Sequence, residues 1–288
     1  MLVDTLTDQT AGTVKLGDLR AKRLGFGAMR ITGKGIWGPP PDREAALAIL
    51  RRVVELGIDL IDTADAYGPD VSEELIAEAL HPYPEGLVIA TKGGLTRTGP
   101  GEWPRDGRPQ HLREACEGSL RRLKLDRIDL YQLHAPDPKV PYEDSVGTLK
   151  ELRDEGKIRH VGVSNVTVAQ LRLARAIVPI VSVQNRFNLE DRSSDDVLGE
   201  CESEDLAFIP WFPLRMSDLA EPGGPVIEIA ERHEATPTQI AIAWLLQRSP
   251  AMLPIPGTAS IDHLEENVAA ARIELSEAEM ETLNDAAE

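Results

Sequence analysis

The feature that most constrains the fold is an alternation, repeated eight times, between a short apolar run and a helix-like segment. Most of the runs are too continuously apolar to have one solvated face, which is typical of parallel strands buried on both sides. We predict strands at residues 23–29, 58–61, 87–91, 128–133, 158–163, 180–184, 206–210 and 252–255. Helices are predicted at about 42–56, 72–80, 109–123, 142–155, 167–177, from 193 onward, 223–234, 237–248, 260–270 and 276–286.

Eight strand–helix units without a linker or a composition break predict an α/β fold, a (β/α)8 TIM barrel, as a single domain over residues 1–288. Residues 13–19 alternate around a turn and predict a short N-terminal hairpin, whereas residues 1–12 are expected to be frayed. A Gly-x-Gly that ends at Gly27 resembles the start of a dinucleotide fingerprint. Arg30 stands where the last glycine belongs, so a Rossmann fold is disfavoured.

Charge and composition argue against several classes of partner. With a net charge of −17 and no basic cluster, the surface should repel nucleic acid and anionic membranes. No apolar run approaches the roughly 20 residues of a membrane span, and the N-terminus lacks the apolar segment of a signal peptide. Cys116 and Cys201 lie far apart in helix-like segments, which predicts reduced thiols and a cytoplasmic location. We expect a small-molecule substrate and a monomer or weak homo-oligomer.

Reactive side chains follow three successive predicted strands. Asp62 ends the second strand, and Tyr67 lies in the loop behind it. Lys92 ends the third strand, and His134 closes the fourth. The strand carboxyl ends of a barrel face one side, where active sites are built. A buried carboxylate costs several kcal/mol unless it is paired, so Asp62 needs a cation, and Lys92 is the best candidate.

Together these side chains can protonate a carbonyl oxygen. Asp62 is expected to hold Lys92, and Lys92 to lower the pKa of the Tyr67 phenol. His134, cationic or neutral, would donate to the same oxygen. Taken singly, each residue has a structural alternative: a buried ion pair, loop packing or a hydrogen-bonded histidine. Their position on consecutive strand ends favours catalysis.

Other chemistries find less support at the strand ends. They carry no cluster of His, Cys or carboxylates sufficient for a catalytic metal. A serine nucleophile, Ser164 with His134 as its base, is conceivable but has no further support. Reduction at this site would therefore need an external hydride donor.

Eight short motifs follow one another along the chain: Ile61-Asp62-Thr63-Ala64, Tyr67-Gly68, Ala90-Thr91-Lys92, Tyr131-Gln132-Leu133-His134, Gly162-Val163-Ser164-Asn165, Gln184-Asn185, Ile255-Pro256-Gly257-Thr258 and Glu266-Asn267. In order and spacing they resemble the aldo-keto reductase superfamily over essentially the whole chain. Within it, the stretches 35–40, 211–214 and 255–260 look most similar to bacterial pyridoxal reductase-type members.

The resemblance implies an NAD(P)H-dependent oxidoreductase that reduces an aldehyde or ketone to an alcohol. It implies the catalytic tetrad Asp62, Tyr67, Lys92 and His134, with Tyr67 as general acid. It implies cofactor contacts from Gly27, Ala28, Met29, Asp62, Ser164, Asn165, Gln184, Trp211, Phe212, Pro213, Leu214, Arg215, Gly257, Thr258, Ser260, His263, Glu266 and Asn267. Substrate would meet Tyr67 and His134, and we expect Trp37 and Trp103, on the two long mouth loops, to line its pocket.

Five of those cofactor contacts have specific expectations. Ser164, Asn165 and Gln184 are implied to hold the nicotinamide carboxamide. Trp211 replaces the usual stacking tyrosine and can stack equally well. Phe212 replaces a common serine, so one hydrogen bond to the cofactor is in doubt.

NADPH is the expected cofactor, with NADH as a weaker substitute. The superfamily usually places a lysine and an arginine on the 2′-phosphate, at positions that are Gly257 and His263 here. The hydroxyls of Thr258 and Ser260, and the free N–H groups of the following helix, still favour a phosphate. Gly257 would let the backbone approach the cofactor, and Gly257→Lys should tighten NADPH. Asp262, Glu265 and Glu266 oppose a phosphate unless they turn outward.

Two other classes of function stay open at this point. One is a cofactor-binding regulatory subunit with little turnover, which the intact tetrad disfavours. The other is a non-redox barrel, such as an isomerase or lyase, whose phosphate site would serve the substrate.

Overall fold

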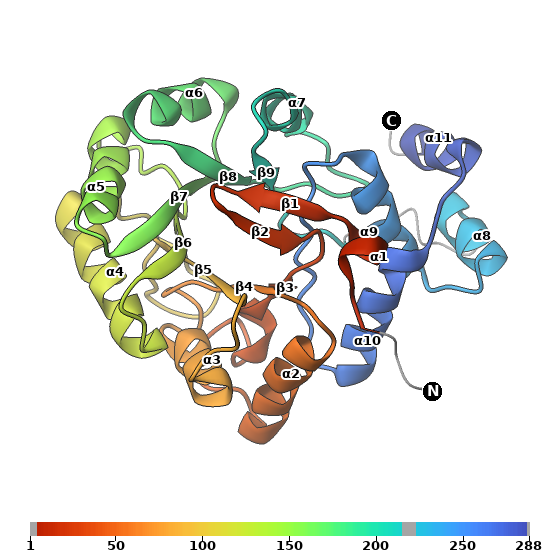
Figure 1. The fold of residues 1–288 in the computed structure, drawn as a ribbon, viewed down its shortest axis with the longest axis horizontal. Coiled ribbons are helices and arrows are strands. Elements are labelled where there is room, and N and C mark those ends of the chain that lie inside the picture. Colours follow the sequence, from red (N-terminus) through yellow and green to blue (C-terminus); the bar gives the residue numbers. More distant parts are fainter. Residues whose placement is uncertain (1–4, 215–222, 287–288) are drawn as a thin grey trace.

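A curled parallel sheet ringed by helices forms the frame of the protein (Figure 1). The computed structural model describes residues 5–214 and 223–286. The sheet runs in chain order, and every neighbouring pair is parallel. Its strands are β3 (Phe26–Gly27), β4 (Leu60–Asp62), β5 (Val88–Gly93), β6 (Ile128–Leu133), β7 (Ile158–Ser164), β8 (Ile180–Gln184) and β9 (Ala207–Phe208). The architecture is the predicted (β/α)8 barrel.

The eighth predicted strand, residues 252–255, is not a regular strand. It closes the barrel through a few hydrogen bonds. On one side Phe208 N donates to Ala251 O and Leu253 N to Phe208 O, both at 2.8 Å, in an isolated parallel bridge, and on the other side Gly25 N donates to Pro254 O at 3.0 Å. Pro254 and Pro256 have no N–H to donate, so a continuous ladder cannot form here. The segment thus joins β9 to the chain before β3 without strand geometry.

The helices pack outside the sheet and lie within a few residues of the predicted ranges (Figure 1). Side-chain oxygens cap several of them: Asp42 accepts the N–H of Ala45 (2.9 Å), and Thr167 and Thr236 form capping boxes. The helices are α2 (Arg43–Glu55), α3 (Val71–Leu80), α4 (Pro109–Leu123), α5 (Tyr142–Asp154), α6 (Val168–Ile177), α7 (Asp195–Ser203), α8 (Pro225–Arg232), α9 (Pro237–Arg248), α10 (Ile261–Ala269) and α11 (Glu277–Asp285).

The prediction of a frayed N-terminus is wrong for residues 5–12. They contain a one-turn helix, α1 (Asp8–Ala11), started by a capping box between Thr7 and Thr10. Leu6 is buried and donates its N–H to Leu56 O at 2.8 Å. Burial of that one leucine and of Ala11 ties the segment to the barrel.

The predicted hairpin exists and plugs one end of the barrel. Its strands, β1 (Thr13–Leu16) and β2 (Leu19–Lys22), pair antiparallel and cross the barrel opening in Figure 1. Leu16 is fully buried and belongs to the same apolar cluster as Leu60 and Val88, the first residues of β4 and β5. The amino-terminal end of the barrel is therefore closed, which leaves the carboxyl end for a site.

Both cysteines are free and buried in the layer between sheet and helices. Burial raises the pKa of the Cys116 and Cys201 thiols to about 12, which makes them poor nucleophiles. Within residues 5–214 and 223–286, none of the helices has the length and apolar character required to cross a membrane.

Candidate active site

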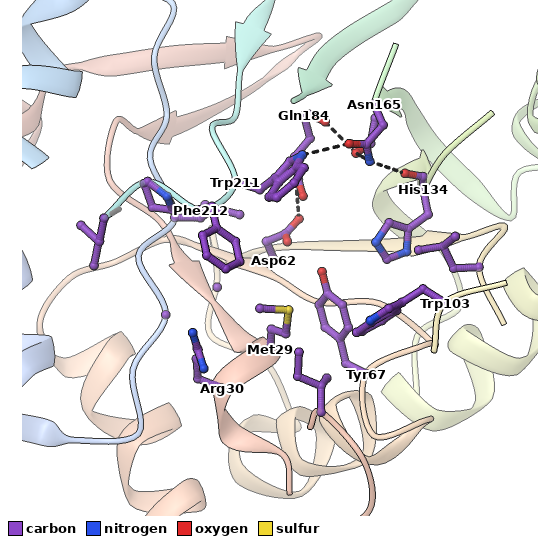
Figure 2. A pocket seen from close by; sticks show the side chains of 18 residues that line it. Met29, Arg30, Asp62, Tyr67, Trp103, His134, Asn165, Gln184, Trp211 and Phe212 are labelled. Carbon is purple, nitrogen blue, oxygen red and sulfur yellow. Dashed lines mark hydrogen bonds between the residues drawn. The ribbon is translucent and has the colours of Figure 1, made fainter. Parts of the chain in front are cut away.

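A cavity of about 630 Å³ opens at the carboxyl ends of the strands, within the size range of small-molecule sites (Figure 2). Residues from both halves of the chain meet there. Its walls are Gly27, Met29, Arg30, Ile36, Asp62, Tyr67, Leu95, Trp103, His134, Ser164, Asn165, Gln184, Trp211, Phe212, Pro213, Leu214, Ile255 and Gly257.

The floor of the cavity holds a buried ion pair. β4 and β5 are parallel neighbours, with Asp62 paired to Ala90, so Lys92, two residues further along β5, lies on the same face of the sheet as Asp62. Lys92 Nζ lies 2.5 Å from Asp62 Oδ1, and the two side chains are 0% and 2% exposed. The other carboxylate oxygen accepts from the amides of Gln132 (3.1 Å) and Gln184 (2.9 Å). Asp62 is thus fully partnered, as a buried carboxylate must be.

The ion pair keeps Lys92 charged. Burial, the largest single influence, would lower the pKa of this ammonium, but Asp62 and then Tyr67 together outweigh it, and the pKa is raised. Lys92 also donates to Thr63 O at 2.9 Å and to the Tyr67 hydroxyl at 3.4 Å. The phenol therefore faces a permanent positive charge.

Tyr67 is protonated at neutral pH. Burial raises the pKa of its phenol, and the opposing influence of the Lys92 ammonium is the smaller of the two. The expected influence of Lys92 is present, since its charge lowers the pKa of the phenol, but desolvation is larger and the net shift is upward. The ring meets His134 and Trp103 edge-on, with centroids 5.8 Å and 6.2 Å away. Figure 2 shows the hydroxyl pointing into the cavity from below Asp62.

His134 is a neutral imidazole. Burial and the nearby Lys92 charge hold its pKa well below the usual value, so a cationic His134 is excluded at neutral pH. Its Nδ1 is buried and has no hydrogen-bond partner in the described part of the chain. A buried polar atom beside a cavity is a ready partner for a bound molecule.

The three residues expected around a carboxamide come together at the ends of β7 and β8 (Figure 2). Asn165 Nδ2 donates to His134 O and to Ser164 Oγ, both at 3.0 Å. Asn165 Oδ1 accepts from the indole of Trp211 at 3.1 Å, and Ser164 Oγ donates to Gln184 O at 2.6 Å. Gln184 also lines the cavity, and its amide nitrogen is engaged by Asp62.

The expected pyrophosphate segment lines the cavity as far as it is described. Phe212, Pro213 and Leu214 are wall residues, whereas Arg215 lies outside the described residues. The Phe212 backbone has a φ of 58°, and its carbonyl accepts from Asn188 Nδ2 at 3.0 Å. Its ring is 46% exposed and meets Trp211 edge-on at 5.8 Å. At the opposite wall, Gly27 and Met29 line the cavity, and Ala28 is fully buried behind them.

Gly257 lines the cavity and also packs against the backbone of Gly27. A Cβ at this position would lie 2.4 Å from Gly27 O, and one at Gly27 would lie 2.6 Å from Ile255 O. The glycines let two backbone segments approach each other at the cavity wall. A side chain at position 257 would displace the backbone of Gly27, which argues against the expected tightening of NADPH by Gly257→Lys.

The remaining expected phosphate contacts surround the start of α10 and are not wall residues of the cavity. Ser260 caps the helix by accepting the N–H of His263 at 3.4 Å, and Thr258 Oγ1 accepts the N–H of Ser260 at 3.0 Å. Glu265 is turned toward Arg52, at 2.6 Å. The other two expected contacts here, Glu266 and Asn267, follow on the same helix, with Asn267 buried.

Trp37 and Trp103 differ in position. Trp103 lines the cavity, as expected, but Trp37 does not, and its neighbour Ile36 takes that place. Trp37 instead pairs with Gly68 in a parallel bridge. A loop sequence does not reveal which of two adjacent side chains turns inward, so the prediction for Trp37 is corrected here.

Sequence reasoning missed two polar residues of the site. Gln132 lay inside a quoted motif, and its even spacing from Leu130 on a strand could have indicated that both face inward. Arg30 lines the cavity beside Gly257, with its Cγ 3.5 Å from the position of a Cβ there. Its place three residues after Gly27, in the short 3-10 turn Ala28–Ile31, was the available signal. Elsewhere in the described ranges, no three or more His, Cys, Asp or Glu side chains are grouped to hold a metal.

Comparison with known proteins agrees with this geometry. The aldo/keto reductase family profile matches residues 23–288. An uncharacterized oxidoreductase of Schizosaccharomyces pombe is 55% identical over 92% of this chain and 87% of its own length. Pyridoxine 4-dehydrogenase of Escherichia coli is 40% identical, over 96% of this chain and 98% of its own.

Solved structures give the same result. A thermostable aldo-keto reductase in complex with the inhibitor epalrestat superposes with a TM-score of 0.84 at 34% identity, covering 95% of this chain and 99% of that one. An aldo-keto reductase from Klebsiella pneumoniae in complex with NADPH gives 0.80 at 29% identity, covering 95% and 94%. The chain belongs to the aldo/keto reductase family.

Proposed function

We propose that this protein reduces an aldehyde or ketone to an alcohol with NADPH, and that Tyr67 gives the proton. One observation carries the assignment of roles. A buried, protonated phenol lies 3.4 Å from a lysine ammonium whose own charge is held by Asp62, at the floor of a cavity of about 630 Å³. The reductase relatives that cover nearly the whole chain support the reaction class.

The described residues fit a nicotinamide dinucleotide. The flat indole of Trp211 is held in place by Asn165, and Ser164 lies beside that amide. Arg30 offers a cation in the wall of the same cavity. The Klebsiella pneumoniae relative binds NADPH, which supports the same cofactor here, with NADH as a weaker substitute.

Bound NADPH supplies the hydride, and the chain's own residues manage the oxygen and its proton. The neutral imidazole of His134 donates a hydrogen bond that orients the carbonyl oxygen toward the Tyr67 hydroxyl. As negative charge develops on that oxygen, Tyr67 transfers its proton. Lys92 stabilises the phenolate that remains, and Asp62 keeps Lys92 in place. All four groups are buried at the cavity floor, which limits the access of water to them.

For the substrate, we propose a small aromatic aldehyde such as pyridoxal. The similarity to pyridoxine 4-dehydrogenase supports this class. The wall near Tyr67 is apolar and aromatic, formed by Ile36, Leu95 and Trp103, which suits a flat ring. We also propose a cytoplasmic location, in keeping with two free, buried cysteines.

The test compares the wild type with Tyr67→Phe. We expect the wild type to oxidise NADPH steadily with pyridoxal, nitrobenzaldehyde or methylglyoxal. The variant removes only the phenolic oxygen, so kcat should fall about 10²–10⁴-fold, while NADPH still quenches Trp211 fluorescence at the same concentrations. A variant that keeps more than about a tenth of kcat would show that Tyr67 is not the acid.

The same assay separates the alternatives. A wild type that binds NADPH but turns over no aldehyde is the outcome for a regulatory subunit. A wild type whose fluorescence does not respond to NADPH is the outcome for a non-redox barrel.

A further inference from the structure

The guanidinium of Arg97 is half-buried and joins three segments around the cavity. Arg97 lies on the loop between β5 and α4, residues 94–108. Its five hydrogen bonds all end on backbone carbonyls, at Ile36 (2.6 Å), Ala66 (2.9 Å), Glu102 (2.9 Å), Gly35 (3.0 Å) and Gly99 (3.3 Å). These acceptors belong to the loop 30–41, to the turn that carries Tyr67, and to the loop of Arg97 itself.

Two indoles complete the surroundings of this guanidinium. Its central carbon lies 3.7 Å from the ring centroid of Trp103 and 5.5 Å from that of Trp37, both within cation–π range. No carboxylate forms an ion pair with Arg97 in the described part of the chain. The charge is thus compensated by carbonyl dipoles and ring faces alone, an arrangement that requires the carbonyls and rings to stay where they are.

Two of the groups that Arg97 contacts, the Ala66 carbonyl and the Trp103 indole, adjoin the reaction site. Ala66, one acceptor, is the residue before Tyr67, so its carbonyl fixes the peptide that carries the proposed acid. Trp103, the nearer indole, meets the Tyr67 ring edge-on at 6.2 Å and lines the cavity. Arg97 itself is not a wall residue, so it can act on a substrate only through these neighbours.

We propose that Arg97 is a positioning residue that sets the aromatic wall formed by Trp103 against Tyr67, and so selects flat aromatic aldehydes over small aliphatic ones. This rests on the proposed reductase function. Trp37, which lies outside the cavity, has its role here as a second ring against the guanidinium. A rigid indole offers stacking area at little entropic cost, whereas a loose one must be ordered by each substrate.

Lysine cannot replace arginine in this arrangement. The planar guanidinium donates five hydrogen bonds in a fixed fork and stacks on a ring, whereas an ammonium donates three and is a point charge. Arg97→Lys therefore keeps the charge but releases carbonyls from at least one of the three segments. Arg105→Lys is the matched control, since Arg105 lies on the same loop, is exposed, and makes one hydrogen bond, to Pro136 O at 2.9 Å.

The experiment measures kcat and KM with nitrobenzaldehyde and with methylglyoxal, together with the dissociation constant of NADPH. For Arg97→Lys we expect kcat/KM for the aromatic aldehyde to fall about tenfold and that for methylglyoxal less than about threefold. NADPH affinity should stay within about twofold, because the proposed nicotinamide contacts lie on the opposite wall. Arg105→Lys should change none of these values.

A double-mutant cycle separates positioning from loop stability. If Arg97 acts through Trp103, then Arg97→Lys should not alter the discrimination further in a Trp103→Ala background. Equal decreases in kcat/KM for both aldehydes, or additive decreases in the double variant, would overturn the proposal. Arg97 would then only hold the loops together, without an effect on substrate choice. A wild type that turns over neither aldehyde would instead refute the reductase function itself.

Discussion

The two ends of the cavity are built in different ways. At the catalytic end, Asp62 and Lys92 come from neighbouring strands with regular parallel pairing and form a buried ion pair whose polar atoms are satisfied. At the opposite end, the wall comes from Gly27, Gly257 and Ile255, where strands are short or absent and backbone meets backbone. Regular strand pairing thus positions the catalytic groups, whereas the opposite wall depends on close contacts between irregular backbone segments.

Removing the cation of the buried pair should have the largest effect on stability. Lys92→Met leaves the Asp62 carboxylate buried without its partner, which costs about 3–5 kcal/mol. The Tyr67 phenol also loses the charge that stabilises its phenolate, so activity should fall as well. Chemical denaturation of variant and wild type measures the difference in unfolding free energy.

Lys15→Met is the matched control for that experiment. Lys15 and Asp205 form an ion pair of almost the same length, 2.6 Å, but their side chains are 58% and 74% exposed. An exposed pair contributes only about 0–1 kcal/mol. Equal losses in the two variants would mean that burial of the Asp62 pair is not what sets its importance.

Substitution of Arg30 tests how the opposite end of the cavity recognises the cofactor. Arg30 is the one arginine or lysine among the described wall residues. Its side chain forms no ion pair and no hydrogen bond within the described part of the chain. Its stem covers the Gly257 position, where a side chain has no room. Because a guanidinium binds phosphate strongly, Arg30→Gln should lower kcat/KM for NADPH about tenfold and for NADH less than about threefold.

The control for this variant is Arg20→Gln on the hairpin at the closed end of the barrel, where Arg20 donates to Thr13 at 2.6 Å. It should leave both cofactors unaffected. Equal losses for NADPH and NADH in Arg30→Gln would place Arg30 on the diphosphate that both share. The 2′-phosphate would then be recognised elsewhere, with Ser260 at the start of α10 as the next position to test.

The catalytic end was predictable from sequence because it needs only strand order. Apolar runs locate the strands, and the last polar residue of each run gives Asp62, Lys92 and His134. The net direction of the Tyr67 pKa was not predictable, because it depends on how deeply the loop after β4 is buried. Sequence shows that a charge is near and does not show how much water is lost.

The cofactor end was harder to predict for a physical reason. Pro254 and Pro256 were visible and argue against a regular eighth strand, but a barrel closed by isolated hydrogen bonds has no sequence pattern of its own. Nothing in the periodicity indicates that Gly257 faces Gly27 or that the Arg30 side chain lies against Gly257. The same limit applies to α1, whose single turn is too short to show a helical period.

The smallest effect should come from Asp65, the one described carboxyl of the catalytic end with a buried oxygen, Oδ1, that lacks a hydrogen-bond partner. Burial, and then the nearby Glu73, raise its pKa well above the usual value, so the folded protein holds this proton more tightly than the unfolded chain. The stability that Asp65 contributes is therefore full below the unfolded pKa, near pH 4, and is lost as the pH rises through the folded value. Asp65→Asn removes that loss, so the melting temperature of the variant relative to wild type should rise between pH 4 and pH 8, by the equivalent of about 1 kcal/mol. Asp18→Asn should show the opposite trend in a lower range, below about pH 4, because Arg159 and His160 hold the pKa of exposed Asp18 below its usual value, and its contribution is lost as the pH falls. If the melting temperatures of Asp65→Asn and wild type change equally between pH 4 and pH 8, the buried oxygen is solvated.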